Sequence, residues 1–140
     1  MSNRDIIENK ISYILKQLGI IRGYQKYSLD ELSHDVILLG GLKWELYVTT
    51  QAAIDLAEAV VAYKQLRKPT TMRESFDILA EQQILDTEFV DRFGKMVGFR
   101  NALAHDYEDL KTVVLYDVLM NKLQEVEEFI QHIKSALHIH

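Results

Sequence analysis

Apolar residues recur along this chain at spacings of three and four, the period of an amphipathic α-helix. The first such stripe lies within residues 3–18 and contains Ile7, Ile11, Ile14 and Leu18. A C-terminal stripe alternates spacings of four and three, and consists of Leu119, Leu123, Val126, Ile130, Ile133 and Leu137. A spacing near 3.5 suits helices that pack at a shallow crossing angle. Both ends of the chain are therefore predicted to be helical.

Capping signals divide the chain into further helices. Ser2 with Asp5 gives an N-cap signature, and capping boxes occur at 28–31 and 71–74. Glycines 19 and 23 bracket the end of the first helix. These signals predict helices that begin near residues 3, 29 and 72.

A long apolar stripe covers residues 42–66 in the middle of the chain. Pro69 ends the helix that this stripe predicts, because the residue before a proline leaves the helical conformation. The pair Gly40-Gly41 weakens the pattern just before it and leaves open whether the chain breaks or bends there. A short amphipathic helix is expected over 71–80. Asp86 or Thr87 then caps a helix whose apolar positions are Phe89, Phe93, Met96, Val97 and Leu103.

Sustained period-two alternation, the pattern of a half-buried strand, is absent from the sequence. The 140 residues contain no internal repeat and no linker-like tract. We therefore predict a single domain, residues 1–140, that is all-α: an antiparallel four-helix bundle with additional short helices.

The composition of the chain excludes several kinds of site. The chain is 48% hydrophobic and 26% charged and has no cysteine, which excludes disulfides, cysteine-bound zinc and thiol catalysis. Its apolar runs are too short to cross a bilayer, and its polar N-terminus lacks a secretory h-region. We therefore expect a cytoplasmic protein with no membrane partner.

Charge limits the possible ligands. The net charge is −5, and residues 101–140 carry three basic and seven acidic residues. Such a chain cannot coat nucleic acid, so an RNA ligand would have to be bound by a few placed cations. Without a glycine-rich phosphate loop, the chain is expected not to bind ATP itself and to need no cofactor. The C-terminal histidines His132, His138 and His140 lack a nearby acid that completes a ligand set, so no catalytic metal is expected.

One segment contains the candidate catalytic residues. Residues 99–107 read Phe-Arg-Asn-Ala-Leu-Ala-His-Asp-Tyr and follow Gly98 directly. The pattern Arg-x4-His-x-Tyr resembles the signature of the HEPN superfamily, in the form found in HepT-like toxins. Further likeness covers most of residues 40–135 and includes 51–57, 75–79, 84–85 and 109–129.

The resemblance implies a metal-independent endoribonuclease that acts as the toxin of a type VII-like toxin–antitoxin pair. Its partner in that family is a minimal nucleotidyltransferase antitoxin, which neutralises the toxin by transferring AMP from ATP onto the motif tyrosine, here Tyr107. The resemblance also implies a homodimer in which the two motifs meet in a composite active site.

The residue types suit metal-free RNA cleavage on their own terms. Histidine has an ordinary pKa near neutrality, which suits His105 as general acid or base. Arginine is permanently charged and forked, which suits Arg100 as a phosphate clamp and transition-state stabiliser. Asn101 can bind a phosphate or orient His105.

Helix geometry adds a condition. Five residues at about 100° each place Arg100 and His105 about 140° apart around a regular helix. Either the helix ends before His105, or the phosphate is shared between two subunits, and both can hold together.

Two other functions remain open: a non-catalytic helical binding module that partners a nucleotidyltransferase, and a plain helical dimerisation protein. Three aromatic residues, Trp44, Tyr47 and Tyr63, are expected to pack between helices. Asp55 is expected to face solvent, although it could also orient a partner in the cleft.

Overall fold

The computed structural model describes residues 2–105 and 108–140, and these residues form helices and no strand. The helices are α1 (Asn3–Arg22), the 3₁₀-helix η1 (Gly23–Lys26), α2 (Leu29–His34), α3 (Val36–Tyr63), α4 (Met72–Glu81), α5 (Thr87–Phe93), α6 (Lys95–His105), α7 (Thr112–Asn121) and α8 (Leu123–Leu137). The predicted all-α class is confirmed.

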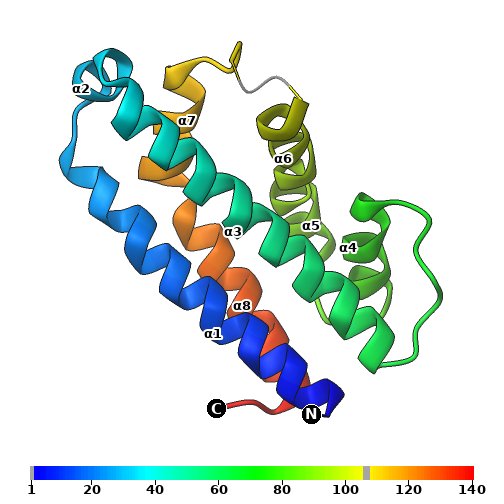
Figure 1. The fold of residues 1–140 in the computed structure, drawn as a ribbon. Coiled ribbons are helices and arrows are strands. Elements are labelled where there is room, and N and C mark those ends of the chain that lie inside the picture. Colours follow the sequence, from blue (N-terminus) through cyan, green and yellow to red (C-terminus); the bar gives the residue numbers. More distant parts are fainter. Residues whose placement is uncertain (1, 106–107) are drawn as a thin grey trace.

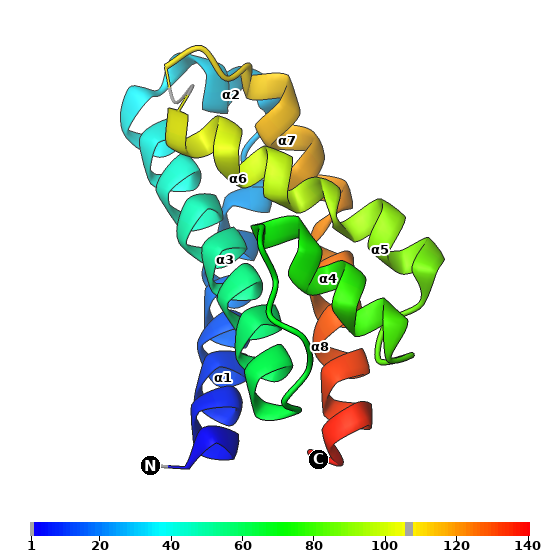
Figure 2. The same cartoon turned by 90° about the vertical axis from the view of Figure 1, so that its right-hand side faces the viewer.

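The long helices form an antiparallel bundle (Figure 1). α3 runs opposite to α1, α5 and α6 run opposite to α3, and α7 and α8 return in the direction of α3. α1, α3 and α8 lie side by side in both views (Figure 2). The described ends of the chain meet at one end of the bundle, where the Arg4 guanidinium donates to the carbonyls of Leu137 at 2.9 Å and His138 at 3.1 Å. The predicted four-helix bundle is thus confirmed.

Side-chain caps fix where α1, α2 and α3 begin. The capping boxes of Ser2 on α1 and Ser28 on α2 are both complete, as the sequence predicts. Asp35 caps α3, because its Oδ1 accepts from the backbone N–H groups of Ile37 and Leu38, each at 3.0 Å. The Asp35 cap escapes prediction from the sequence, because no acidic residue follows it three positions later.

The predicted box at 71–74 is only half formed. Thr71 accepts from the Glu74 backbone N–H at 3.1 Å, but the Glu74 carboxylate accepts instead from the Thr70 N–H at 3.1 Å and from Arg67 at 3.0 Å. Arg67 also pairs with Glu81 at 2.6 Å and lowers the pKa of that carboxyl group. The arginine therefore ties both ends of α4 to the segment that precedes it.

α3 runs without interruption through Gly40-Gly41. The Tyr24 hydroxyl lies 2.5 Å from where a Cβ on Gly41 would be, so a side chain at this position would force Tyr24 to move. At its other end α3 stops at Tyr63, earlier than the predicted 66, because Gln65 adopts a left-handed conformation (φ 55°).

Two predicted helices are each interrupted by one residue. The helix expected to hold both Phe89 and Leu103 is divided at Gly94 into α5 and α6, and the C-terminal helix is divided at Lys122 into α7 and α8. Lys122 has φ −117°, well outside helical values. Near Gly94 the Arg73 guanidinium fills the space beside the backbone. The apolar period continues across both breaks, so periodicity alone could not reveal them.

An aromatic cluster joins the C-terminal half of the bundle. Phe76 of α4 is fully buried, with its ring centroid 5.6 Å from that of Phe93 and 5.7 Å from that of Phe129. Phe89 stacks on Phe93 at 5.0 Å. These edge and stacked geometries are the favourable ones for aromatic pairs, so the cluster holds α4, α5 and α8 together.

Among the described residues, the helices are too short or too polar to span a membrane.

The cluster gives a test of the fold. We expect Phe76→Ala to lower the free energy of unfolding by about 3–5 kcal/mol, because it removes a buried ring and leaves a cavity between three helices. Urea denaturation followed by circular dichroism measures this change. Gln131→Ala, at an exposed position of α8, serves as the control and should change it by less than about 0.5 kcal/mol.

Candidate functional site

The C-terminal half of α6 carries the predicted site residues. Arg100 and Asn101 are half-buried, and His105 is exposed as the last residue of the helix. Tyr107 lies outside the described residues. The structure therefore describes three of the four predicted site residues.

Arg100 extends from α6 onto α3 and is held there by neutral groups. Its Nε–H donates to the Gln51 Oε1 at 2.7 Å, and one Nη1–H donates to the Asn101 Oδ1 at 3.2 Å. An Nη2–H points to the Tyr47 hydroxyl at 3.4 Å, and the guanidinium carbon lies 5.5 Å from the centroid of the Tyr47 ring. Three side chains thus fix the guanidinium without neutralising it.

Among the described residues, Arg100 has no ion-pair partner. This is unusual in a chain with 21 acidic residues, where the other arginines pair with carboxylates. Of the five N–H groups of a guanidinium, three are directed to the partners above. With respect to the described residues, the charge of Arg100 is therefore unpaired, and two of its N–H groups remain for an incoming anion.

The His105 side chain makes no hydrogen bond or ion pair with another described residue. Since α6 includes His105, the helix does not end before the histidine, and that option is wrong. Helical geometry keeps Arg100 and His105 on different sides of α6. A phosphate shared between two subunits stays a prediction.

Polar residues four apart on α3 support Arg100. Gln51, which accepts from Arg100, donates through its Nε2 to the Asp55 Oδ1 at 2.9 Å. The roles of Tyr47 and Gln51 were not predicted from the sequence. The available signal was the i, i+4, i+8 series of polar-tipped residues at 47, 51 and 55 on a helix that is otherwise largely apolar. Asp55 is half-buried and bound within this series, so the expectation of a simple solvent-facing residue is wrong.

The expectation that Trp44 packs between helices is also wrong. Trp44 is 58% exposed, and its ring lies 6.0 Å from that of Tyr47. Tyr63, at the end of α3, does pack against the core.

The described residues contain no cluster of three or more histidine, aspartate or glutamate side chains that could hold a metal ion. Of the C-terminal histidines, His132 packs against Phe89, with 5.1 Å between ring centroids.

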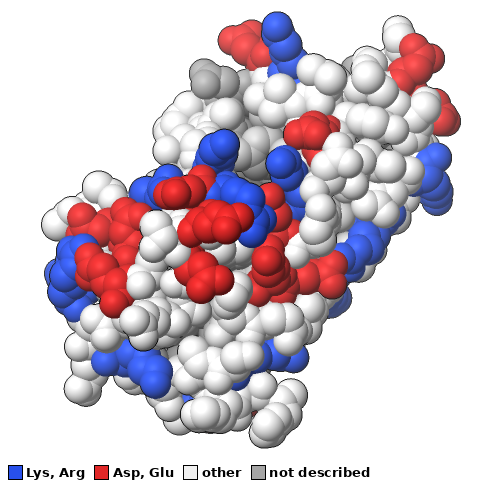
Figure 3. Space-filling model, turned by 180° about the vertical axis from the view of Figure 1, so that it is seen from behind, with Lys and Arg blue, Asp and Glu red and all other residues white. Residues whose placement is uncertain are grey.

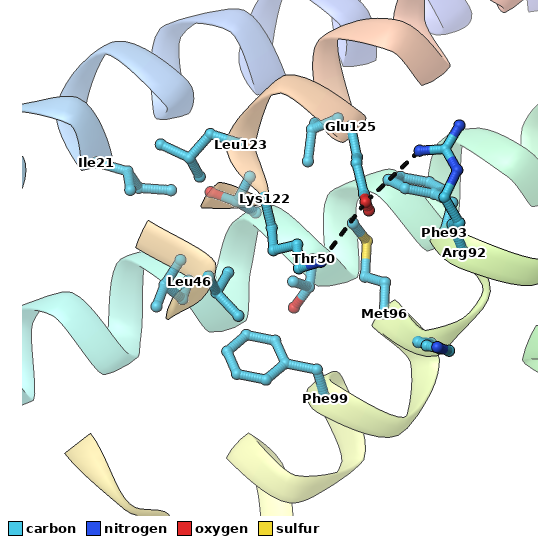
Figure 4. Close-up of a pocket in the computed structure, with 14 residues that line it drawn as sticks. Ile21, Leu46, Thr50, Arg92, Phe93, Met96, Phe99, Lys122, Leu123 and Glu125 are labelled. Carbon is cyan, nitrogen blue, oxygen red and sulfur yellow. Dashed lines mark ion pairs between the residues drawn. The ribbon is translucent and has the colours of Figure 1, made fainter. Parts of the chain in front are cut away.

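A separate pocket of about 140 Å³ lies beside the breaks at Gly94 and Lys122 (Figure 4). Its walls are mainly apolar and include Met96 and Phe99 of α6. At its edge the Glu125 carboxylate pairs with Arg92 at 3.6 Å and with Lys122 at 4.0 Å. Arg100, Asn101 and His105 do not line it. The motif and the pocket thus use different sides of α6.

Acidic and basic side chains are interleaved over the face of the molecule opposite to the view of Figure 1 (Figure 3). Arg73 pairs with acids of α4 and α5, and Arg92 pairs with two acids of α8. This face offers no broad basic surface, in line with the charge argument from the sequence.

Comparison with known proteins identifies the family. A family model described as "Ribonuclease HepT-like" matches residues 14–133, most of the chain. The chain belongs to the HepT-like ribonuclease family. The predicted resemblance to HEPN and HepT-like proteins is therefore confirmed.

Individual proteins that are similar to this HepT-like chain are also named as HepT nucleases or as a HEPN toxin. It is 33% identical over 132 residues to the mRNA nuclease HepT of Shewanella oneidensis, covering 94% of this chain and 98% of the relative. It is 27% identical over 132 residues to the tRNA nuclease HepT of Aphanizomenon flos-aquae, covering 94% and 90%. A solved structure of the tri-AMPylated Shewanella oneidensis HEPN toxin in complex with MNT antitoxin is similar at a TM-score of 0.85 and 31% identity, covering 96% of this chain and 99% of that chain.

The two glycines that precede the motif behave differently. No described residue lies within 4 Å of a Cβ built on Gly98, whereas one on Gly94 would meet the Arg73 guanidinium. We expect Gly98→Ala to raise the free energy of unfolding by about 0.5–1 kcal/mol, because alanine favours the helix. Gly94→Ala should raise the free energy of unfolding by clearly less, because the Arg73 side chain must move to make room for the new methyl group. Urea denaturation compares the two, and an equal gain at both positions would contradict the contact at Gly94.

Proposed function

We propose that this chain is a metal-independent endoribonuclease that acts as the toxin of a toxin–antitoxin pair. The observation that carries the proposal is the charge of Arg100: in a HepT-like chain, five residues before His105, this arginine is held by neutral partners and has no carboxylate partner among the described residues. A structural arginine in so acidic a chain would be expected to form an ion pair.

The chemistry is transfer of the phosphodiester within RNA. The 2′-oxygen attacks the adjacent phosphorus, the bond to the 5′-oxygen breaks, and a 2′,3′-cyclic phosphate and a 5′-hydroxyl form. One proton leaves the 2′-hydroxyl and one reaches the departing 5′-oxygen, and His105 accepts or donates at these positions. Arg100 binds the phosphoryl oxygens, whose negative charge rises in the transition state. Asn101, in contact with Arg100, helps to hold the guanidinium or binds the same phosphate.

The active site is composite and forms in a homodimer. One face of α3 carries Val36, Ile37 and Trp44, which are 86%, 87% and 58% exposed, and continues into Tyr47 and Gln51. Burying such an apolar face against a second copy is favourable. It would bring two motifs together, so that Arg100 of one protomer and His105 of its partner can face one phosphate. Two histidines would then be available for the two proton transfers.

The substrate is RNA. The two curated relatives are named for different RNA classes, messenger and transfer RNA, and RNA is the class that both share.

The antitoxin is a nucleotidyltransferase that modifies Tyr107. The phenol oxygen of Tyr107 attacks the α-phosphorus of ATP, a tyrosyl–AMP phosphodiester forms, and pyrophosphate leaves. The complex of the tri-AMPylated Shewanella oneidensis toxin with its MNT antitoxin supports this partner. An AMP group two residues from His105 would place bulk and negative charge where the RNA phosphate must bind.

Two substitutions test the catalytic assignment. We expect His105→Ala and Arg100→Ala each to lower RNA cleavage by about 10²–10⁴-fold, because they remove the proton-transfer group and the phosphate clamp. Cleavage of labelled RNA is measured in EDTA, with folding checked by circular dichroism.

Matched controls are His34→Ala, which removes an exposed histidine, and Arg22→Ala, which removes a surface arginine paired with Glu127. Both should cleave as the unsubstituted protein does. Equal activity in all five proteins would indicate a contaminating nuclease. Tight binding of a nucleotidyltransferase without cleavage would favour the non-catalytic module instead.

Modification is tested separately. Incubation with ATP and the cognate nucleotidyltransferase should add the mass of AMP to a peptide that contains Tyr107 and should suppress cleavage. Tyr107→Phe should block both effects, whereas Tyr13→Phe, at an exposed tyrosine of α1, should block neither. Peptide mass spectrometry locates the group, and label found only at another residue would contradict the assignment.

A further inference from the structure

We propose that Gln51, oriented by Asp55, is a positioning residue that sets the Arg100 guanidinium for phosphate binding without neutralising its charge. This inference rests on the proposed function, because it assigns Gln51 a role through Arg100 rather than a contact with substrate. The juxtaposition that carries it is a series of hydrogen bonds from Asp55 through Gln51 to Arg100, across the contact between α3 and α6.

The two hydrogen bonds determine which way the Gln51 amide faces. An amide presents an acceptor oxygen on one side and a donor nitrogen on the other. The Asp55 carboxylate can only accept, so it binds the nitrogen at 2.9 Å and turns the oxygen toward Arg100 at 2.7 Å. Without Asp55 the amide would lose this preference, and its nitrogen could face the guanidinium, where donor would meet donor.

Glutamine at 51 fixes Arg100 while preserving its charge. A carboxylate at that position would also accept from the Nε–H, but it would pair with the guanidinium and compete with a phosphate. In the observed arrangement the negative charge of Asp55 is one side chain farther away. The bond to Nε–H uses the inner edge of the guanidinium, and one N–H on each Nη remains for the ligand beside those directed to Asn101 and Tyr47.

Tyr47 restrains the guanidinium from a second direction. Its ring lies 5.5 Å from the guanidinium carbon, within range of a cation–π interaction, and its hydroxyl is 3.4 Å from Nη2. Contacts at both the edge and the face of a planar group restrict its rotation. Arg100 therefore reaches its phosphate already oriented, which favours the reaction because less freedom is lost in the transition state.

Single-turnover cleavage of a defined RNA tests the inference. We expect Gln51→Ala to lower the rate at saturating RNA by about 10²-fold, the loss typical of a misplaced catalytic group. Gln51→Glu keeps an acceptor for Arg100 and should recover much of that rate, but the carboxylate should raise the RNA concentration needed for half-maximal rate. Asp55→Ala should lower the rate at saturating RNA as well, but by less than Gln51→Ala does.

A second readout does not depend on cleavage. The Nε–H signal of Arg100 in a ¹⁵N NMR spectrum, assigned by its disappearance in Arg100→Lys, should exchange slowly with solvent. Gln51→Ala should make the exchange fast. Ala62→Ser, at an exposed position near the end of the same helix, is the control and should change neither the exchange nor the cleavage.

The outcomes distinguish failure of the positioning role of Gln51 from failure of the proposed function. If the unsubstituted protein cleaves RNA and Gln51→Ala cleaves equally well, the positioning role is overturned and the proposed function stands. If Gln51→Ala and Gln51→Glu lose the same rate with no difference in RNA dependence, glutamine acts only in folding, which also overturns the role. If the unsubstituted protein does not cleave RNA at all, the proposed function fails, and the inference with it, even when the Nε–H signal behaves as expected.

Discussion

The contact between Arg100 and α3 is the constraint on which the candidate site depends. A guanidinium that is partly removed from water needs hydrogen-bond acceptors, and carboxylates are the common choice in a chain with 21 acidic residues. Here an amide oxygen from Gln51, a second from Asn101 and the ring and hydroxyl of Tyr47 take that place. The cation is thereby fixed in position while its charge remains available to an anionic ligand.

α3 provides this contact because it is one continuous helix. Its exposed start carries Val36 and Ile37, its middle receives Arg100, and its end is covered by α1 and α4. A break at Gly40-Gly41 would separate the exposed apolar face from the residues that hold Arg100. The Asp35 cap and the close packing of Tyr24 on Gly41 therefore stabilise the part of the fold that relates the proposed dimer surface to the motif.

Unlike α3, two other long helical segments are interrupted, one between α5 and α6 and one between α7 and α8. Breaks at Gly94 and Lys122 border one apolar pocket, and the ion pairs of Glu125 with Arg92 and Lys122 connect the two sides. α6 can therefore follow α3 while α5 remains fixed in the aromatic cluster of Phe76, Phe93 and Phe129.

Local rules were enough to predict the helices, the Ser2 and Ser28 caps and the Arg-x4-His motif, because each depends on residues within a few positions of one another. The bundle followed because several amphipathic helices with no strand to cover must bury their apolar stripes against one another. The breaks at Gly94 and Lys122 escaped prediction, since the apolar period crosses them unchanged. The partners of Arg100 could not be read locally either: Gln51 and Tyr47 are 49 and 53 positions away in the chain. Their polar atoms acquire a role only when α6 packs on α3, and that packing is decided by the whole core.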